Sequence, residues 1–252
     1  MGYSSRKKTS SWSLPDWGFL AAFLFWSAAG LTFTLLRITP TVIAGWGLPD
    51  GLNQFVHFCL NNGDPILILL AAANTHLLAC RQWTPQEARS WAVLIMLLSY
   101  GVEMVGVLTG LPFGNYIYTH NFGPVLFHVP LAIPLAWFVV VTNVLLVIRS
   151  VVPHLPRLAE ALIGGILCML YDYTLEPFAT RVKSYWVWEG GNVAMINYPA
   201  WLMISGVLIW FFAPSLMTRN RLDPRPWLIL GIMILIFFAG RWAAGEFAGA
   251  GN

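Results

Sequence analysis

The chain has 252 residues, of which 58% are hydrophobic, 15% aromatic and only 10% charged, and its formal net charge is +3. A soluble domain carries about 25% charged residues, so this composition excludes an ordinary soluble globule, a disordered chain and a nucleic-acid-binding module. The mean hydropathy of +0.67 indicates instead a polytopic, all-α integral membrane protein.

Apolar runs of about 20 residues, the length at which a helix crosses a bilayer, recur along the chain and predict seven transmembrane helices. Residues 1–13, before the first run, are expected to form a disordered cytoplasmic tail, and residues 14–252 a single transmembrane helical domain. The second run is interrupted at Asn61–Pro65, which indicates a broken or short helix. The predicted spans are 17–38, 54–79, 89–109, 125–149, 158–177, 198–217 and 226–244.

The basic residues are distributed unevenly over the loops between these spans. With seven spans, ten Lys and Arg residues fall on the side of the N-terminus and four on the opposite side. Because cytoplasmic loops of membrane proteins carry the excess of Lys and Arg, we expect the N-terminus inside and the C-terminus outside.

A buried carboxylate costs about 2.5–3.5 kcal/mol at a helix centre on insertion scales, and three acids of the predicted spans are expected to bear this cost. Glu103 is on the third span, and Asp172 and Glu176 are on the fifth; the orientation puts all three in the outer third of the bilayer. They could simply pair with Arg181, Lys183 or a backbone donor, but acids at one level without a basic neighbour inside the membrane favour a functional pocket. Clustered carboxylates repel one another, so at least one should keep its proton.

Small residues share a helical face with these acids, and a third polar stripe occurs on the sixth span. Small residues let membrane helices approach closely, so the two acidic stripes are expected to face each other across a tight interior. The stripes are Ser99, Glu103, Gly106 and Gly110; Ala161, Gly165, Cys168, Asp172 and Glu176; and Asn197, Trp201 and Ser205.

Neither a metal nor a cofactor is expected. The five His residues lack the paired spacing of a di-iron site, and the three Cys residues form no C-x-x-C pair. Asp172-x-x-x-Glu176 has the form of a diphosphate–Mg²⁺ motif, but the second acidic repeat of membrane prenyltransferases is missing. The remaining interpretation is a site with a neutral acid that donates a proton and a carboxylate that orients a water. These two groups are what acid-catalysed addition to an apolar substrate requires.

Four motifs together resemble the CruF-type carotenoid 1,2-hydratases, a family of carotenoid biosynthesis membrane proteins that includes the bisanhydrobacterioruberin hydratases. The resemblance extends over residues 95–205. The motifs are E-x-x-G-x-x-x-G-x-P-F-G-x-Y-x-Y at Glu103–Tyr118, D-x-x-x-E-P at Asp172–Pro177, Y-W-x-W at Tyr185–Trp188 and N-x-x-x-W at Asn197–Trp201.

The resemblance implies that water adds across the terminal C1–C2 double bond of an acyclic carotenoid end group and gives a tertiary 1-hydroxy carotenoid. Protonation at C2 creates a tertiary cation at C1, which aromatic faces stabilise. Asp172 or Glu103 is expected to donate the proton, with Glu176 as its partner or as the residue that orients the water. The residues expected to line or roof the pocket are Tyr116, Tyr118, Trp186, Trp188, Asn197 and Trp201.

The expected partners are a lipophilic carotenoid and membrane lipid, with no nucleic acid, in a bacterial or archaeal plasma membrane. Three other functions fit the same composition. A non-catalytic carotenoid-binding or transport protein would use the apolar cavity and keep the acids for packing. A membrane prenyltransferase would need Mg²⁺ and a diphosphate, and a carotenoid cyclase would give an isomeric product without added oxygen.

Overall fold

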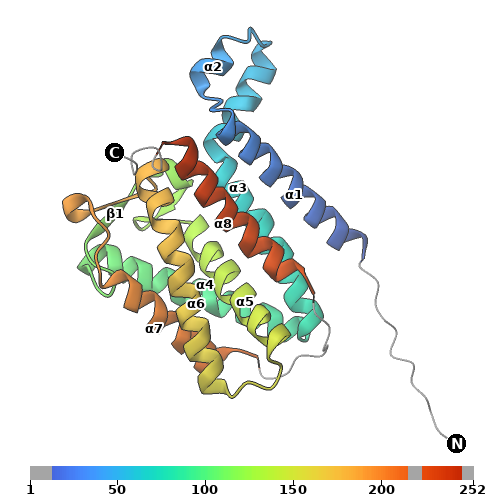
Figure 1. Ribbon diagram of the computed structural model, residues 1–252, viewed down its shortest axis with the longest axis vertical. Coiled ribbons are helices and arrows are strands. Elements are labelled where there is room, and N and C mark those ends of the chain that lie inside the picture. Colours follow the sequence, from blue (N-terminus) through green and yellow to red (C-terminus); the bar gives the residue numbers. More distant parts are fainter. Residues whose placement is uncertain (1–12, 215–222, 246–252) are drawn as a thin grey trace, which may run out of the picture.

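The computed structural model describes residues 13–214 and 223–245, which form a bundle of helices with short β-ribbons at one end (Figure 1). Residues 1–12 of the predicted disordered tail lie outside the described residues. A π-helical turn, Phe178–Val182, continues α6. The helices are α1 (Leu14–Leu35), α2 (Pro40–Ala44), α3 (Asp50–Gln82), α4 (Pro85–Thr109), α5 (Ala132–Val151), α6 (Arg157–Pro177), α7 (Asn197–Phe212) and α8 (Arg225–Ala243).

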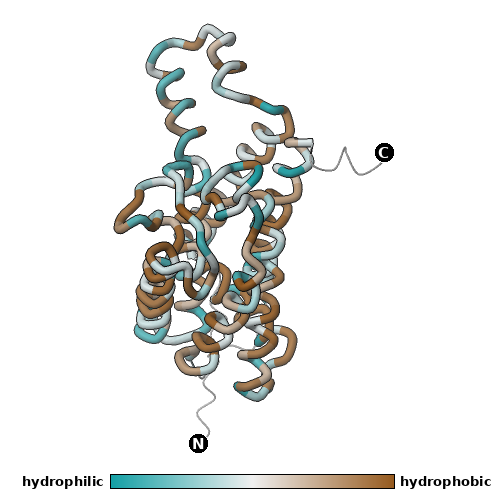
Figure 2. Tube along the Cα trace, turned by 90° about the vertical axis from the view of Figure 1, so that its left-hand side faces the viewer, coloured by the Kyte–Doolittle hydropathy of each residue, from teal (hydrophilic) through white to brown (hydrophobic). Residues whose placement is uncertain are grey.

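Six helices in the described part of the chain are long and apolar enough to cross a membrane, namely α1, α3, α4, α5, α6 with its π-helical turn, and α8. Figure 2 shows hydrophobic residues predominating along the bundle helices. The predicted class, an all-α helical membrane protein, is therefore confirmed. The helix α7 is apolar but has only 16 residues, about 24 Å at 1.5 Å per residue. The count of seven spans and their orientation stay predictions.

The predicted interruption of the second span is wrong, because α3 runs without a break through Pro65. Proline lacks an N–H and normally disturbs the preceding turn. Here side chains bond to backbone carbonyls beside it. The Trp26 indole donates to the Gly63 carbonyl at 2.8 Å, and the Asn62 amide donates to the Phe58 carbonyl at 3.0 Å. The bond from Trp26 comes from another helix, α1, and holds the turn that precedes the proline.

The fourth predicted span starts too early. Residues 125–130 form a small antiparallel ribbon of β2 (Val125–Leu126) and β3 (Val129–Pro130), and α5 begins only at Ala132. The ribbon turns at Phe127 and His128, whose φ angles are +44° and +67°. Hydropathy alone does not separate this apolar ribbon from the helix that follows.

The helix α4 begins and ends where its local sequence directs. The Thr84 hydroxyl accepts from the Glu87 N–H at 3.2 Å, and the Glu87 carboxylate accepts from the Thr84 N–H at 2.9 Å, which completes a capping box. Gly110 ends the helix in the left-handed conformation, with φ +75°. These signals hold Glu103 within two turns of the end of α4 that lies beneath the β-ribbons.

The small residues beside the acids make contacts other than the expected one. On α6, a Cβ built at Gly165 would lie 2.5 Å from the Leu202 carbonyl oxygen, so this face packs closely against α7. On α4, a Cβ at Gly106 would lie 2.8 Å from the Phe113 ring and 3.0 Å from the Tyr116 hydroxyl. The acidic faces of α4 and α6 are therefore separated by a cavity and loop aromatic residues, and the expected tight packing between them is wrong.

A two-stranded antiparallel ribbon covers the end of this cavity. Strand β1 (Tyr116–Tyr118) pairs with β4 (Trp186–Trp188), with Tyr116 opposite Trp188 and Tyr118 opposite Trp186. Side chains alternate across a strand, so the two tyrosines and two tryptophans point inward while the central residue of each strand is exposed. We call this ribbon the roof.

Candidate active site

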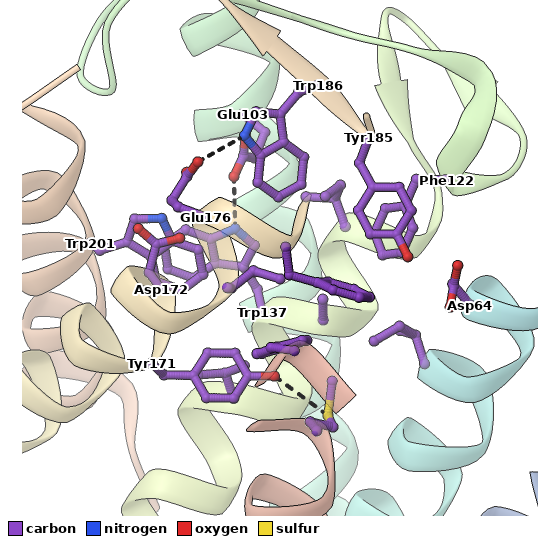
Figure 3. Close-up of a pocket in the computed structure, with 18 of the residues that line it drawn as sticks. Asp64, Glu103, Phe122, Trp137, Tyr171, Asp172, Glu176, Tyr185, Trp186 and Trp201 are labelled. Carbon is purple, nitrogen blue, oxygen red and sulfur yellow. Dashed lines mark hydrogen bonds between the residues drawn. The ribbon is translucent and has the colours of Figure 1, made fainter. Parts of the chain in front are cut away.

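A cavity lies beneath the roof and is lined by residues of α3, α4, α5, α6, α7 and α8. The structure brings every site residue predicted from the sequence to the wall of this cavity, and Figure 3 shows several of them. They are Glu103, Tyr116, Tyr118, Asp172, Glu176, Trp186, Trp188, Asn197 and Trp201.

The Glu103 carboxyl group is held by three neutral donors. One oxygen, Oε2, accepts from the hydroxyls of Tyr116 at 2.6 Å and Tyr118 at 2.8 Å. The other, Oε1, accepts from the indole N–H of Trp137 at 2.8 Å. Burial, followed by the neighbouring Glu103, raises the pKa of Tyr116 and of Tyr118 above the usual value of a phenol. Both phenols therefore stay protonated and available as donors to Glu103.

The Glu176 carboxyl group also accepts three hydrogen bonds. The indole N–H groups of Trp188 and Trp186 donate to Oε2 at 2.9 and 3.2 Å, and the Asn197 amide donates to Oε1 at 3.3 Å. Both tryptophans come from β4, so the pairing of the roof sets the position of this carboxyl group.

Asp172 lies one turn before Glu176 on α6 and has fewer partners. Among the described residues it accepts one hydrogen bond, from the Asn197 amide at 2.6 Å. Asn197 is the first residue of α7, and its amide therefore bridges the two acids of α6. The three acids thus differ in their surroundings, since two accept three donors each and the third accepts one.

All three acids are buried in an apolar setting. Their exposed fractions are 5% for Glu103, 1% for Asp172 and 2% for Glu176. Within residues 13–214 and 223–245, no Lys, Arg or His lines the cavity. Nor does this part of the chain contain a group of three His, Cys, Asp or Glu side chains placed to hold a metal ion. The acids are therefore held by neutral hydrogen-bond donors alone.

An aromatic wall adjoins the acids. Trp137 from α5 and Trp201 from α7 stack with ring centroids 3.8 Å apart and an interplanar angle of 5°. Sequence reasoning missed Trp137, because residues 132–141 of α5 are all apolar and no periodicity distinguishes a cavity-facing indole from a lipid-facing one. It also missed Tyr171, whose hydroxyl lies 3.5 Å from the Met233 sulfur at the cavity floor. Aromatic faces attract cations, so this wall can stabilise positive charge in a bound ligand.

The chain is similar in sequence to one protein family and to a relative of known name. A model of the family described as "Carotenoid biosynthesis protein" matches residues 63–248, which include every site residue above. The bisanhydrobacterioruberin hydratase of Haloarcula japonica is 32% identical over 126 residues, which cover 48% of this chain and 43% of that relative. The match thus spans less than half the length of the curated relative. No solved structure matches this chain.

Proposed function

This chain belongs to the carotenoid biosynthesis protein family, and on that premise we propose that it is a hydratase of acyclic carotenoids. It adds water across the terminal C1–C2 double bond of an end group and gives a tertiary alcohol, with no cofactor. The relative named as a hydratase supports a hydration reaction. The bond that reacts and the roles of the residues are our inferences from the site.

The unequal hydrogen bonding of the three acids carries this proposal. An ionised carboxylate in an apolar cavity needs several donors, whereas a neutral carboxylic acid needs few. Glu103 and Glu176 accept three donors each, and Asp172 accepts one. We therefore assign Asp172 as the protonated acid and the two glutamates as carboxylates.

The reaction then proceeds in two steps. Asp172 transfers its proton to C2 of the end group, and the π-bond electrons form the new C–H bond, which leaves a tertiary cation at C1. A water oriented by Glu176 attacks C1 and gives a proton to that carboxylate. The proton returns from Glu176 to Asp172, its neighbour across the Asn197 amide, so the enzyme is restored and one water is consumed.

The remaining groups stabilise the intermediate cation. Glu103 supplies a fixed negative charge, and the stacked pair Trp137–Trp201 offers a π-face, worth roughly 0.5–2 kcal/mol for each favourable cation contact. The neutral donors of the roof are already oriented toward the carboxylates, so little reorganisation accompanies the reaction. A non-catalytic carrier would not need this graded set of acids.

We further propose seven spans with the N-terminus inside, so that the site lies near the outer surface. Asp16 in the first turn of α1 contacts Arg225 at the start of α8, with Oδ1 and Nη1 3.2 Å apart. Both helices thus begin at the same face of the bundle. An even number of crossings must therefore separate the start of α1 from the start of α8. The helices α1 and α3–α6 supply five of them, so α7 supplies the sixth.

Isotope labelling tests the proposed reaction. Purified protein and an acyclic carotenoid such as lycopene are incubated anaerobically in H₂¹⁸O, and the products are analysed by mass spectrometry. Hydration predicts one ¹⁸O for each end group that is hydrated, and the same reaction in D₂O predicts one deuterium at C2 of each such end group. Oxygen drawn from O₂ in a parallel ¹⁸O₂ experiment would overturn the proposal, as would an isomer without oxygen or a requirement for Mg²⁺ and a diphosphate.

A further inference from the structure

We propose that the cavity admits one end group of the substrate through a mouth between α3 and residues 183–185, closed by the ion pair of Asp64 and Lys183. The polyene stays outside this mouth, so the two ends of a symmetric substrate are hydrated in separate binding events. This inference rests on the proposed function, because it states how that substrate enters and in what order its ends react.

The cavity is sealed at the end that holds the acids. Asp172, Glu176 and Asn197 are each no more than 2% exposed. Behind them α6 and α7 are in backbone contact, since Gly165 of α6 has no space for a Cβ against the Leu202 carbonyl. An end group of several carbons cannot pass between helices packed in this way.

The opposite end of the cavity is lined by a partly exposed residue, Asp64. Figure 3 shows Asp64 on α3 across the cavity from Asp172, with the Tyr185 hydroxyl directed toward it. Asp64 lines the cavity, yet its side chain is 26% exposed, and that of its partner Lys183 is 32% exposed. Asp64 therefore belongs both to the cavity wall and to the surface, which is why we place the mouth here.

The ion pair is the part of this mouth that can open. The Lys183 ammonium lies 2.8 Å from the Asp64 carboxylate and 5.7 Å from the centre of the Phe178 ring. Partly exposed ion pairs contribute little stability, so an entering ligand can separate this one. The adjoining rim is rigid, because a Cβ at Gly123 would lie 2.9 Å from the Pro65 ring. Phe122 stacks on Tyr185 with ring centroids 4.3 Å apart.

The dimensions of the bundle exclude a fully enclosed substrate. From α6 the cavity passes α5 and ends at α3, which amounts to two helix spacings of about 8–10 Å each. An acyclic carotenoid is a rigid rod comparable in length with the hydrocarbon core of a bilayer, about 30 Å. When one end group lies beside the acids, the rest of the rod must project through the mouth.

Labelling of a single cysteine after folding tests the position of the mouth. Asp64→Cys is made in the full chain with Cys59→Ser and Cys80→Ser, and Cys168 is kept because it is fully buried. A bulky maleimide on this cysteine should lower pigment retention and hydration at least tenfold relative to the unlabelled variant. Bound carotenoid should in turn slow the labelling.

The matched control is Leu69→Cys in the same background. Leu69 lies on α3 within two turns of Asp64 but is 57% exposed on the outer surface. Labelling at this position should change neither retention nor hydration. Equal effects of labelling at the two positions, or no effect of labelling at Asp64→Cys, would overturn the proposed position of the mouth. Pigment retention and protection from labelling do not require turnover, so they test the position of the mouth independently of catalysis. A wild-type protein that binds carotenoid but hydrates none would refute the proposed function and leave the mouth to be judged by these two measurements.

A pulse–chase experiment tests the order of the two hydrations. Enzyme is loaded with isotopically labelled lycopene and then mixed with a large excess of unlabelled lycopene. Separate binding events predict that the labelled substrate leaves as the singly hydrated product, with the doubly hydrated product appearing only later. If the labelled substrate instead leaves as the doubly hydrated product despite the unlabelled excess, the two ends react in one binding event and the inference is refuted.

Discussion

Replacement of Asp172 by Asn removes the transferable proton and little else. The side-chain volume is unchanged, and the new amide oxygen can still accept the hydrogen bond that the Asn197 amide now gives to Asp172 at 2.6 Å. Among the described residues no other donor contacts this group, so no buried donor loses its partner. We therefore expect the variant to fold and to be extracted with wild-type yield.

Its activity should nevertheless fall steeply. General acid catalysis contributes about 10²–10⁴-fold, which corresponds to about 3–5 kcal/mol at 1.36 kcal/mol for each factor of ten. The assay is the amount of hydrated carotenoid formed per milligram of monodisperse protein, measured by liquid chromatography. Wild-type activity in Asp172→Asn would refute the assignment and leave this acid a packing role.

Glu103→Gln provides the contrast. Three neutral donors surround the Glu103 carboxyl group, and a glutamine presents one oxygen and one NH₂ group to them. At least one buried donor then faces another donor, which costs about 1–3 kcal/mol. We expect this variant to lose thermal stability as well as activity, whereas Asp172→Asn loses activity alone.

Three further predictions concern the scaffold. Asp16→Ala should lower the free energy of unfolding by about 1.5–3 kcal/mol in a detergent denaturation series, because it removes the buried acid that pairs with Arg81 and Arg225; unchanged stability would contradict this. Gly165→Ala should cost about 1–3 kcal/mol and reduce hydration, since the added methyl overlaps the facing backbone. Gly231→Ala, whose Cβ meets nothing within 4 Å, is its control, and equal melting temperatures for the two variants would count against the packing argument. An impermeant thiol reagent applied from outside should label Asn121→Cys and not Gln86→Cys, and the reverse pattern would invert the proposed orientation.

Most of the helices could be predicted because their signals are local. A run of apolar residues makes a helix in lipid wherever the rest of the chain lies, and the 3.6-residue period places Asp172 and Glu176 on one buried face. The sequence likewise placed Asn197 and Trp201 on one face, and both line the cavity. These inferences depend only on neighbours within a few residues.

The two predictions of span boundaries that failed did so for different reasons. Pro65 is a helix-breaking signal, but α1 supplies a donor to the turn before it, from Trp26. The β2–β3 ribbon is apolar, so hydropathy extended the fourth span to include it. The bond from Trp26 joins parts of the chain that no short sequence window contains, whereas the ribbon forms within residues 125–130 and was missed because hydropathy does not separate it from the helix.

The individual environments of the acids were decided by tertiary structure. Glu103 receives donors from β1 and α5, and Glu176 from β4 and α7, so the roof must pair strands about 70 residues apart before either site exists. A sequence records that Tyr118 and Trp186 are aromatic, but not that they meet across a ribbon and donate to different carboxyl groups. The sequence by itself therefore determined that Glu103, Asp172 and Glu176 are buried, because their burial follows from local hydropathy and helical period. Only the tertiary structure decided how many donors each acid receives, because hydrogen-bond partners are set by the packing of segments remote in the chain.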